Sequence, residues 1–91
     1  MTDRRILVVE DDPDTLRRMV SLLETEGWRT TSAANSSEGF YAAVGHFPDL
    51  VVLDLELPGM DGCQVIGHLR EWYEGPIIAL SDRGEEENVI R

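Results

Sequence analysis

The chain alternates short strand-like runs with stretches of helical periodicity, and this alternation limits the folds that it can adopt. The strand-like runs span Arg4–Val9, Trp28–Ala33, Leu50–Leu53 and Ile77–Leu80. Strands that are separated by helical crossovers pair in parallel through right-handed connections. The order therefore predicts a doubly wound, parallel α/β sheet. A length of 91 residues is enough for one domain with one core.

Three helices are predicted between these runs, at about residues 12–27, 35–46 and 61–75. Asp12 suits the N-cap of the first helix and Gly27 suits its C-terminal end. Asn35 and Glu38 resemble a capping box at the start of the second. The segment Asp82–Arg91 is predicted to open a further helix. Four aromatic residues are interpreted as packing residues: Trp28, Phe40, Tyr41 and Trp72.

Carboxylates stand at the ends of two apolar runs, with no Lys or Arg beside them in the sequence. They are Glu10, Asp11 and Asp12 after the first run, and Asp54 after the third. The carboxyl ends of the strands form the ligand-binding edge of a doubly wound sheet, so these side chains are expected to meet. Clustered carboxylates repel one another unless a cation intervenes, and oxygen ligands favour Mg²⁺ or Ca²⁺. The pattern predicts a metal site at this edge, with Asp12 capping the following helix.

A phosphate is the second group that this edge could bind. Mg²⁺ in proteins is commonly held by one or two carboxylates together with a phosphate. An aspartate beside the metal can attack phosphorus and form an aspartyl phosphate. Ser81, at the end of the fourth run, could then donate a hydrogen bond to the phosphate. Taken singly, Asp54 and Ser81 could each be a turn or cap residue, so the prediction depends on their joint placement.

Charge and composition exclude several function classes. The net charge is −10, and phosphate contacts need clustered Lys and Arg, so nucleic-acid binding by this segment is not expected. All eight basic residues are arginine. The single cysteine, Cys63, excludes an internal disulfide. No apolar run approaches the about 20 residues of a membrane span, and the N-terminal run is too short for a secretory signal. A cytoplasmic location is the default expectation.

Two segments together resemble a known family. Ile6–Asp12, followed by Val51–Gly62 with its Asp-Leu-Glu-Leu-Pro-Gly-Met-Asp-Gly stretch, is similar to bacterial two-component response-regulator receiver domains. Residues Pro76–Ser81 fit the fourth strand of that family. The resemblance implies a flavodoxin-like sheet of strand order 2-1-3-4-5. A weaker likeness, in Leu69–Trp72, is to receivers that are joined to winged-helix transcription factors.

The resemblance also implies a role for each site residue. Asp54 would be the phosphoacceptor, charged by a sensor histidine kinase. Mg²⁺ would be the cofactor, held by Asp11, Asp54 and the backbone carbonyl of Glu56, with Glu10 acting more through water. Ser81 would be the switch residue that turns toward the phosphate. The loop beside the site would be shaped by Pro58 and Gly62.

The sequence departs from the family pattern at its C-terminal end. The family continues with a fifth strand, a lysine at the end of that strand and a fifth helix, and the chain contains no lysine. We therefore expect a receiver that is incomplete at its C-terminus, with the order 2-1-3-4. Its fourth strand, Ile77–Leu80, would be an open edge through which the chain could self-associate.

Two alternative functions remain open from the sequence. A phosphohydrolase of the haloacid-dehalogenase type also places a nucleophilic aspartate at a strand end. Such enzymes have a second aspartate two residues later, where this chain has Glu56. The other alternative is a receiver-like interaction module that is not phosphorylated. The leading interpretation is a phosphoacceptor rather than an enzyme.

Overall fold

The computed structural model describes residues 4–54, 62–71, 73–80 and 88–90. Its strands form a single sheet of order β2-β1-β3-β4-β5. The strands are β1 (Arg5–Val9), β2 (Arg29–Ala33), β3 (Leu50–Asp54), β4 (Ile77–Leu80) and β5 (Asn88–Ile90). The first four pair in parallel, and this confirms the predicted order 2-1-3-4.

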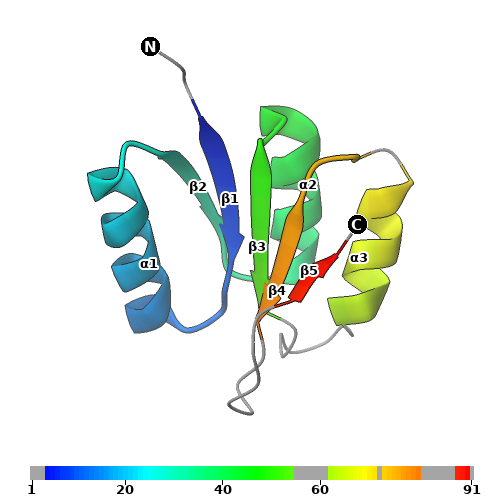
Figure 1. Ribbon diagram of the computed structural model, residues 1–91. Helices are drawn as coiled ribbons and strands as arrows, with labels where there is room; N and C mark the ends of the chain where they lie inside the picture. Colours follow the sequence, from blue (N-terminus) through cyan, green and yellow to red (C-terminus); the bar gives the residue numbers. More distant parts are fainter. Residues whose placement is uncertain (1–3, 55–61, 72, 81–87, 91) are drawn as a thin grey trace.

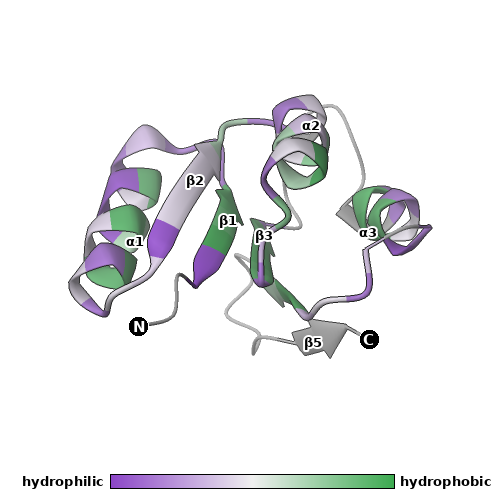
Figure 2. Cartoon of the chain, turned by 90° about the horizontal axis from the view of Figure 1, so that it is seen from above, coloured by the Kyte–Doolittle hydropathy of each residue, from purple (hydrophilic) through white to green (hydrophobic). Residues whose placement is uncertain are grey.

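Helices cover both faces of the sheet. They are α1 (Pro13–Thr25), α2 (Ser36–His46) and α3 (Gly62–Arg70). Figure 1 shows them beside the strands, and Figure 2 shows α1 on one face with α2 and α3 on the other. The strongly apolar strands β1 and β3 lie between the two layers. Within the described segments, no helix is long and apolar enough to cross a lipid bilayer.

Alternation along β1 and β3 divides the core between the two faces. Leu7, Val9 and Leu53 point to the side of α2 and α3, whereas Ile6 and Val8 point to the side of α1. Leu53 is fully buried, and burying a side chain of this size contributes roughly 1.5–3 kcal/mol to stability. The central strands are buried on both faces, which is why they read as unbroken apolar runs.

The ends of the helices follow the predicted signals. Asn35 accepts a hydrogen bond from the Glu38 amide at 2.9 Å, and Glu38 accepts one from the Ala34 amide at 3.0 Å. Gly27, just after α1, has φ of +97°, a backbone conformation that favours glycine. The third helix ends at Arg70, earlier than predicted, and the predicted packing residue Trp72 lies outside the described residues.

Two expectations are wrong at the C-terminal end of the chain. Residues Asn88–Ile90 form a strand rather than part of a helix, and this strand pairs antiparallel with β4. The predicted open edge of β4 is therefore covered, which removes the predicted route to self-association. An edge strand offers unpaired N–H and C=O groups, and the apolar pair Val89 and Ile90 suits a strand that satisfies them. The rest of the predicted helix, 82–87, lies outside the described residues.

One aromatic residue also departs from expectation. Phe40 packs against the core and Trp28 packs against the α1 side, as predicted. Tyr41, however, is 74% exposed on the outer face of α2. A helix of this length directs only one stripe of side chains at the sheet, and Phe40 occupies that stripe.

Candidate functional site

The site lies at the edge of the sheet where the parallel strands end. Val9 and Leu53 are register partners near the ends of the adjacent strands β1 and β3. Glu10 directly follows β1, and Asp54 is the last residue of β3. In Figure 1 both strands end at the same, lower edge of the sheet. Parallel pairing thus brings residues 44 positions apart in the sequence to one place.

Three carboxylates meet at this edge. Glu10, Asp11 and Asp54 each offer an oxygen atom, and these oxygens all lie within 4.8 Å of one another. Glu10 is 8% exposed and Asp54 is 5% exposed, whereas Asp11 is open to solvent. Glu10 and Asp54 are the two buried charged residues of the described segments. We call these three residues the acidic cluster.

Glu10 carries the clearest electrostatic cost of the cluster. Burial, together with the nearby carboxylates of Asp54 and Asp11, raises its pKa from 4.5 to about 7. A hydrogen bond from the Asp12 amide to Oε2 of Glu10, at 3.1 Å, opposes the shift. The Glu10 amide also donates to the Ala33 carbonyl at 3.0 Å, which holds this turn against the end of β2. The cluster is therefore a fixed group of acids that repel one another.

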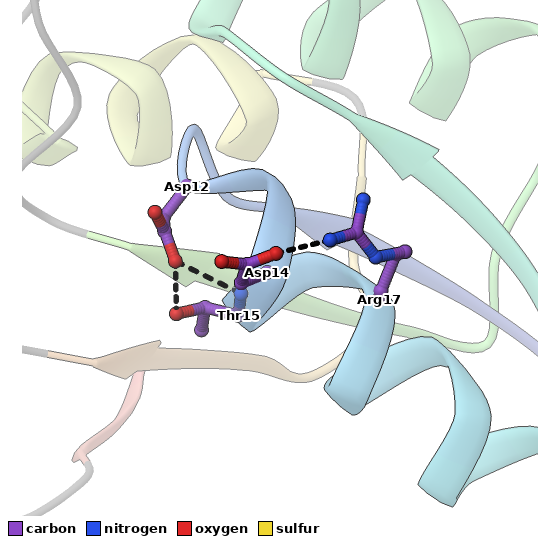
Figure 3. A network of polar contacts seen from close by, with 4 residues as sticks. All are labelled: Asp12, Asp14, Thr15 and Arg17. Atoms are coloured by element: carbon purple, nitrogen blue, oxygen red, sulfur yellow. Dashed lines mark hydrogen bonds and ion pairs between the residues drawn. The ribbon is translucent and has the colours of Figure 1, made fainter.

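Asp12 has a structural role, as predicted. Its Oδ2 accepts hydrogen bonds from the Thr15 amide at 2.9 Å and from the Thr15 hydroxyl at 2.6 Å, which caps α1 (Figure 3). These bonds lower the pKa of Asp12. Asp14 pairs with Arg17 on the exposed side of the same turn. Asp12 thus faces the helix rather than the acidic cluster, although it is two residues from Glu10.

Four predicted site residues remain to be placed. Glu56, Pro58 and Ser81 lie outside the described residues. Gly62 is the first residue of α3, so it belongs to a helix start rather than to a loop. Leu80, the residue before Ser81, is the register partner of Asp54 in the adjacent strand.

Backbone contacts at the site were not foreseen from the sequence. The tie from Glu10 to Ala33 and the contact from Asp12 to Glu10 both involve main-chain groups. No side-chain type identifies a main-chain donor. The one available signal is that Asp12 must cap a helix that begins immediately after β1, so its amide lies beside the preceding turn.

The donor set suits a hard divalent cation. All three groups are carboxylates, and an ion with ligands at roughly 2.0–2.6 Å spans oxygens up to about 4–5 Å apart. The measured limit of 4.8 Å lies in that range. Burial and the neighbouring carboxylates together raise the pKa of Glu10, and a bound cation would offset both by favouring the charged form. The residues present therefore fit Mg²⁺.

Comparisons with known proteins agree with this geometry. The family model for the response regulator receiver domain matches residues 6–91. The transcriptional regulatory protein KdpE of Mycobacterium tuberculosis is 37% identical over 86 residues, covering 94% of this chain and 38% of that protein. The KDP operon transcriptional regulatory protein KdpE of Escherichia coli is 40% identical over 85 residues, covering 93% of this chain and 38% of that protein. The chain thus spans less than two-fifths of the length of these relatives.

A solved structure extends the comparison to three dimensions. The response regulator protein TrrA of Thermotoga maritima, in complex with Mg²⁺ and BeF, superposes with a TM-score of 0.83. The sequences are 34% identical, and the match covers 89% of this chain and 71% of that chain.

Proposed function

Because the chain belongs to the response regulator receiver domain family, we propose that it accepts a phosphoryl group on Asp54. The observation that supports this most is the acidic cluster: a buried Asp54 at a strand end, within 4.8 Å of two further carboxylates. Receiver domains take their phosphoryl group from histidine kinases. We therefore propose a sensor histidine kinase as the partner.

The proposed reaction is a phosphoryl transfer to a carboxylate. An Asp54 oxygen attacks phosphorus, a new O–P bond forms, and the P–N bond of the kinase phosphohistidine breaks. The electron pair of that bond returns to the histidine nitrogen, which then takes up a proton. Most of the help that a protein gives such a transfer is positioning and charge stabilisation. Asp54 is 5% exposed, so its carboxylate lies where little water reaches it and where nearby charges act more strongly.

We propose Mg²⁺ as the cofactor, held by Glu10, Asp11, Asp54 and the backbone carbonyl of Glu56. When bound, it would neutralise the charge of the carboxylates and of the incoming phosphoryl group. Asp11 is the exposed member of the cluster, so it offers the ion its route in. Glu10 must give up its proton as the ion binds, because its pKa lies near 7 without the ion.

Three further residues have proposed supporting roles. Ser81 would donate a hydrogen bond to the phosphoryl group, since it follows Leu80, the register partner of Asp54. Pro58 and Gly62 would shape the connection from β3 to α3. Like its relatives that are named as transcriptional regulatory proteins, the chain would act in the cytoplasm on transcription, through parts of a longer protein.

The family match favours this function over the two alternatives. A haloacid-dehalogenase-type hydrolase belongs to another family and has a second aspartate at the position where this chain has Glu56. We propose that the chain holds its phosphoryl group rather than turning over phosphoesters. A receiver-like module that is not phosphorylated is the alternative that the experiment below must exclude.

The test is phosphorylation by a small donor. The 91-residue chain is incubated with acetyl phosphate and Mg²⁺, and its intact mass is measured. We expect one phosphoryl adduct, lost in Asp54→Asn and on chelation of the metal. Asp12→Asn is the matched control, because it also removes one acid of this turn but keeps a cap, so it should keep the adduct. An unmodified wild-type chain that still binds Mg²⁺ would favour the interaction module, and repeated turnover would favour the hydrolase.

A further inference from the structure

A second surface lies at the opposite edge of the sheet, where β3 and β4 begin. A hollow of about 360 Å³ opens there between two connections, α2 to β3 and α3 to β4. Its lining comes from Phe47, Pro48 and Asp49 on one side and from Tyr73, Glu74 and Gly75 on the other. Since β3 is five residues long, the hollow is about 17 Å from the acidic cluster.

Apolar side chains continue from the hollow along α2. Tyr41 is 74% exposed, Val44 is 44% exposed and Phe47 is 72% exposed. Their spacing of three residues keeps them on one side of the helix. Among the eleven residues of α2, Glu38 is the one formal charge, although the whole chain carries −10. Exposed aromatic residues in a surface with few charges are typical of the centre of a protein interface. We call the hollow together with Tyr41 and Val44 the Phe47 surface.

Phe47 is the most informative residue of this surface. It is the C-cap of α2 and has φ of +49°, a left-handed conformation that normally selects Gly or Asn. Its ring is nevertheless directed largely into solvent rather than into the core. The fold would be better served by glycine at this position, so stability does not explain the aromatic ring. Strain at an exposed residue is a reason to look for a binding role.

The hollow itself is preformed. Arg70 donates from Nη1 to the carbonyl of Tyr73 at 2.9 Å and to that of Gly75 at 2.7 Å, which fixes the wall formed by the α3–β4 connection. On the other wall, Oδ2 of Asp49 accepts from the Arg5 amide at 2.8 Å. The Arg5 side chain turns to the His46 carbonyl at 3.1 Å, at the end of α2. A partner would therefore meet little reorganisation cost.

Charge decides which partner fits. The residues that line the hollow include two acids, Asp49 and Glu74, and no Arg or Lys. The Arg70 guanidinium lies at the edge of one wall, where its charge is shared with the carbonyls of Tyr73 and Gly75. Burial raises the pKa of the Tyr73 hydroxyl, the nearby Asp49 raises it further, and Arg70 lowers it. A second copy of the chain brings a net charge of −10 and no lysine, so repulsion opposes it. We propose that the Phe47 surface docks a basic segment of a partner protein, with an Arg or Lys in the hollow and a neighbouring apolar side chain on Tyr41 and Val44.

The probe is a short synthetic peptide in which arginine and leucine alternate with glycine, added to the 91-residue chain. Backbone amide NMR shifts are followed during the titration. We expect saturable shifts at Val44, Phe47 and Gly75, with none at the acidic cluster. A peptide with glutamate in place of arginine should not bind. Equal binding of both peptides, or shifts spread over all acidic surfaces, would overturn the proposal.

Variants separate binding from folding. Phe47→Gly and Phe47→Asn both suit the left-handed backbone, so the fold should keep its thermal stability while the peptide binds about tenfold more weakly. Glu74→Gln should weaken binding through the loss of charge. Leu22→Ala is the matched control, because it removes an exposed apolar side chain from α1 and should leave binding unchanged. Unaltered peptide binding in the Phe47 variants would contradict the proposal. A wild-type dimer in sedimentation that Phe47→Gly converts to a monomer would also contradict it, because the surface would then bind a second copy of the chain.

Discussion

Acidic side chains have opposite surroundings at the two edges of the parallel sheet. At the carboxyl edge, Glu10 and Asp54 are buried next to each other and next to Asp11, and the pKa of Glu10 rises to about 7. At the amino edge, Asp49 is hydrogen bonded to the Arg5 amide, and the Asp49 amide donates in turn to the Arg5 carbonyl at 2.8 Å. At the amino edge the carboxylate of Asp49 is satisfied by a main-chain donor, whereas at the carboxyl edge three carboxylates stand next to one another. Removing an acid should therefore have opposite effects at the two edges.

The largest effect is expected from Glu10→Gln. The folded-state pKa of Glu10 lies above its ordinary 4.5, so the folded chain holds more protons than the unfolded chain between pH 4.5 and about 7. Stability is then lost as pH rises through that window, by about 3 kcal/mol at most. With EDTA present, the unfolding free energy of wild type should fall as pH rises from 4.5 to about 7, and that of Glu10→Gln should not. The difference between the two proteins should therefore grow by about this amount over the window. Urea unfolding at several pH values measures the difference, and parallel curves for the two proteins would refute it.

Mg²⁺ should offset the loss of stability that the buried carboxylates cause at the carboxyl edge. A ligand at about 100 times its Kd stabilises the folded state by about 2.7 kcal/mol. Wild type should gain stability on this scale, and Asp54→Asn and Asp11→Asn should lose most of the gain. Asp12→Asn should keep it, since Asp12 caps α1 outside the acidic cluster. Thermal unfolding with and without Mg²⁺ tests this, and an equal gain in all four proteins would place the ion elsewhere.

At the amino edge, removing an acid should lower the stability of the fold instead of raising it. Asp49→Ala removes the acceptor of the Arg5 amide, which should lower stability by about 1 kcal/mol. Asp49→Asn keeps an oxygen acceptor in the same place and should recover most of the loss. Equilibrium urea unfolding compares the three chains. A stabilising Asp49→Ala would break the distinction between the two edges.

The smallest effect belongs to Asp12, which is fully exposed. Hydrogen bonds from Thr15 lower its pKa below 3.8, so its contribution is present above that pH and is lost as pH falls through the lower folded-state value. Asp12→Ala should fray the first turn of α1, and Asp12→Asn should not. Amide hydrogen exchange at the start of α1 is the measurement. Equal exchange in Asp12→Ala and wild type would show that the cap contributes nothing.

Local signals explain why most of the fold was predictable. The caps at Asp12 and Asn35 and the stop at Gly27 act within one helical turn, so short sequence windows contain them. The meeting of Glu10 and Asp54 also follows from the sequence, because parallel strands with helical crossovers must end at one edge. The parallel strand order is therefore enough to predict that these two carboxylates lie close together.

Features that depend on distant partners could not be predicted in the same way. The strand β5 forms because it lies beside β4, and a short segment with three glutamates before it reads more readily as a helix start. The sequence predicts Tyr41 as a packing residue, but the helical stripe that meets the sheet contains Phe40, and Tyr41 lies exposed. The hydrogen bond between Arg5 and Asp49 joins residues 44 positions apart, and neither residue type implies the other.

Asp12 joins two parts of the molecule in a single residue. Its amide donates to the Glu10 carboxylate, and its side chain holds the first turn of α1. Protonation or metal binding at Glu10 therefore changes the strength of a bond whose donor is anchored to a helix. The first turn of α1 is thereby coupled to the charge at the sheet edge, and the NMR resonance of the Asp12 amide should shift when that charge changes.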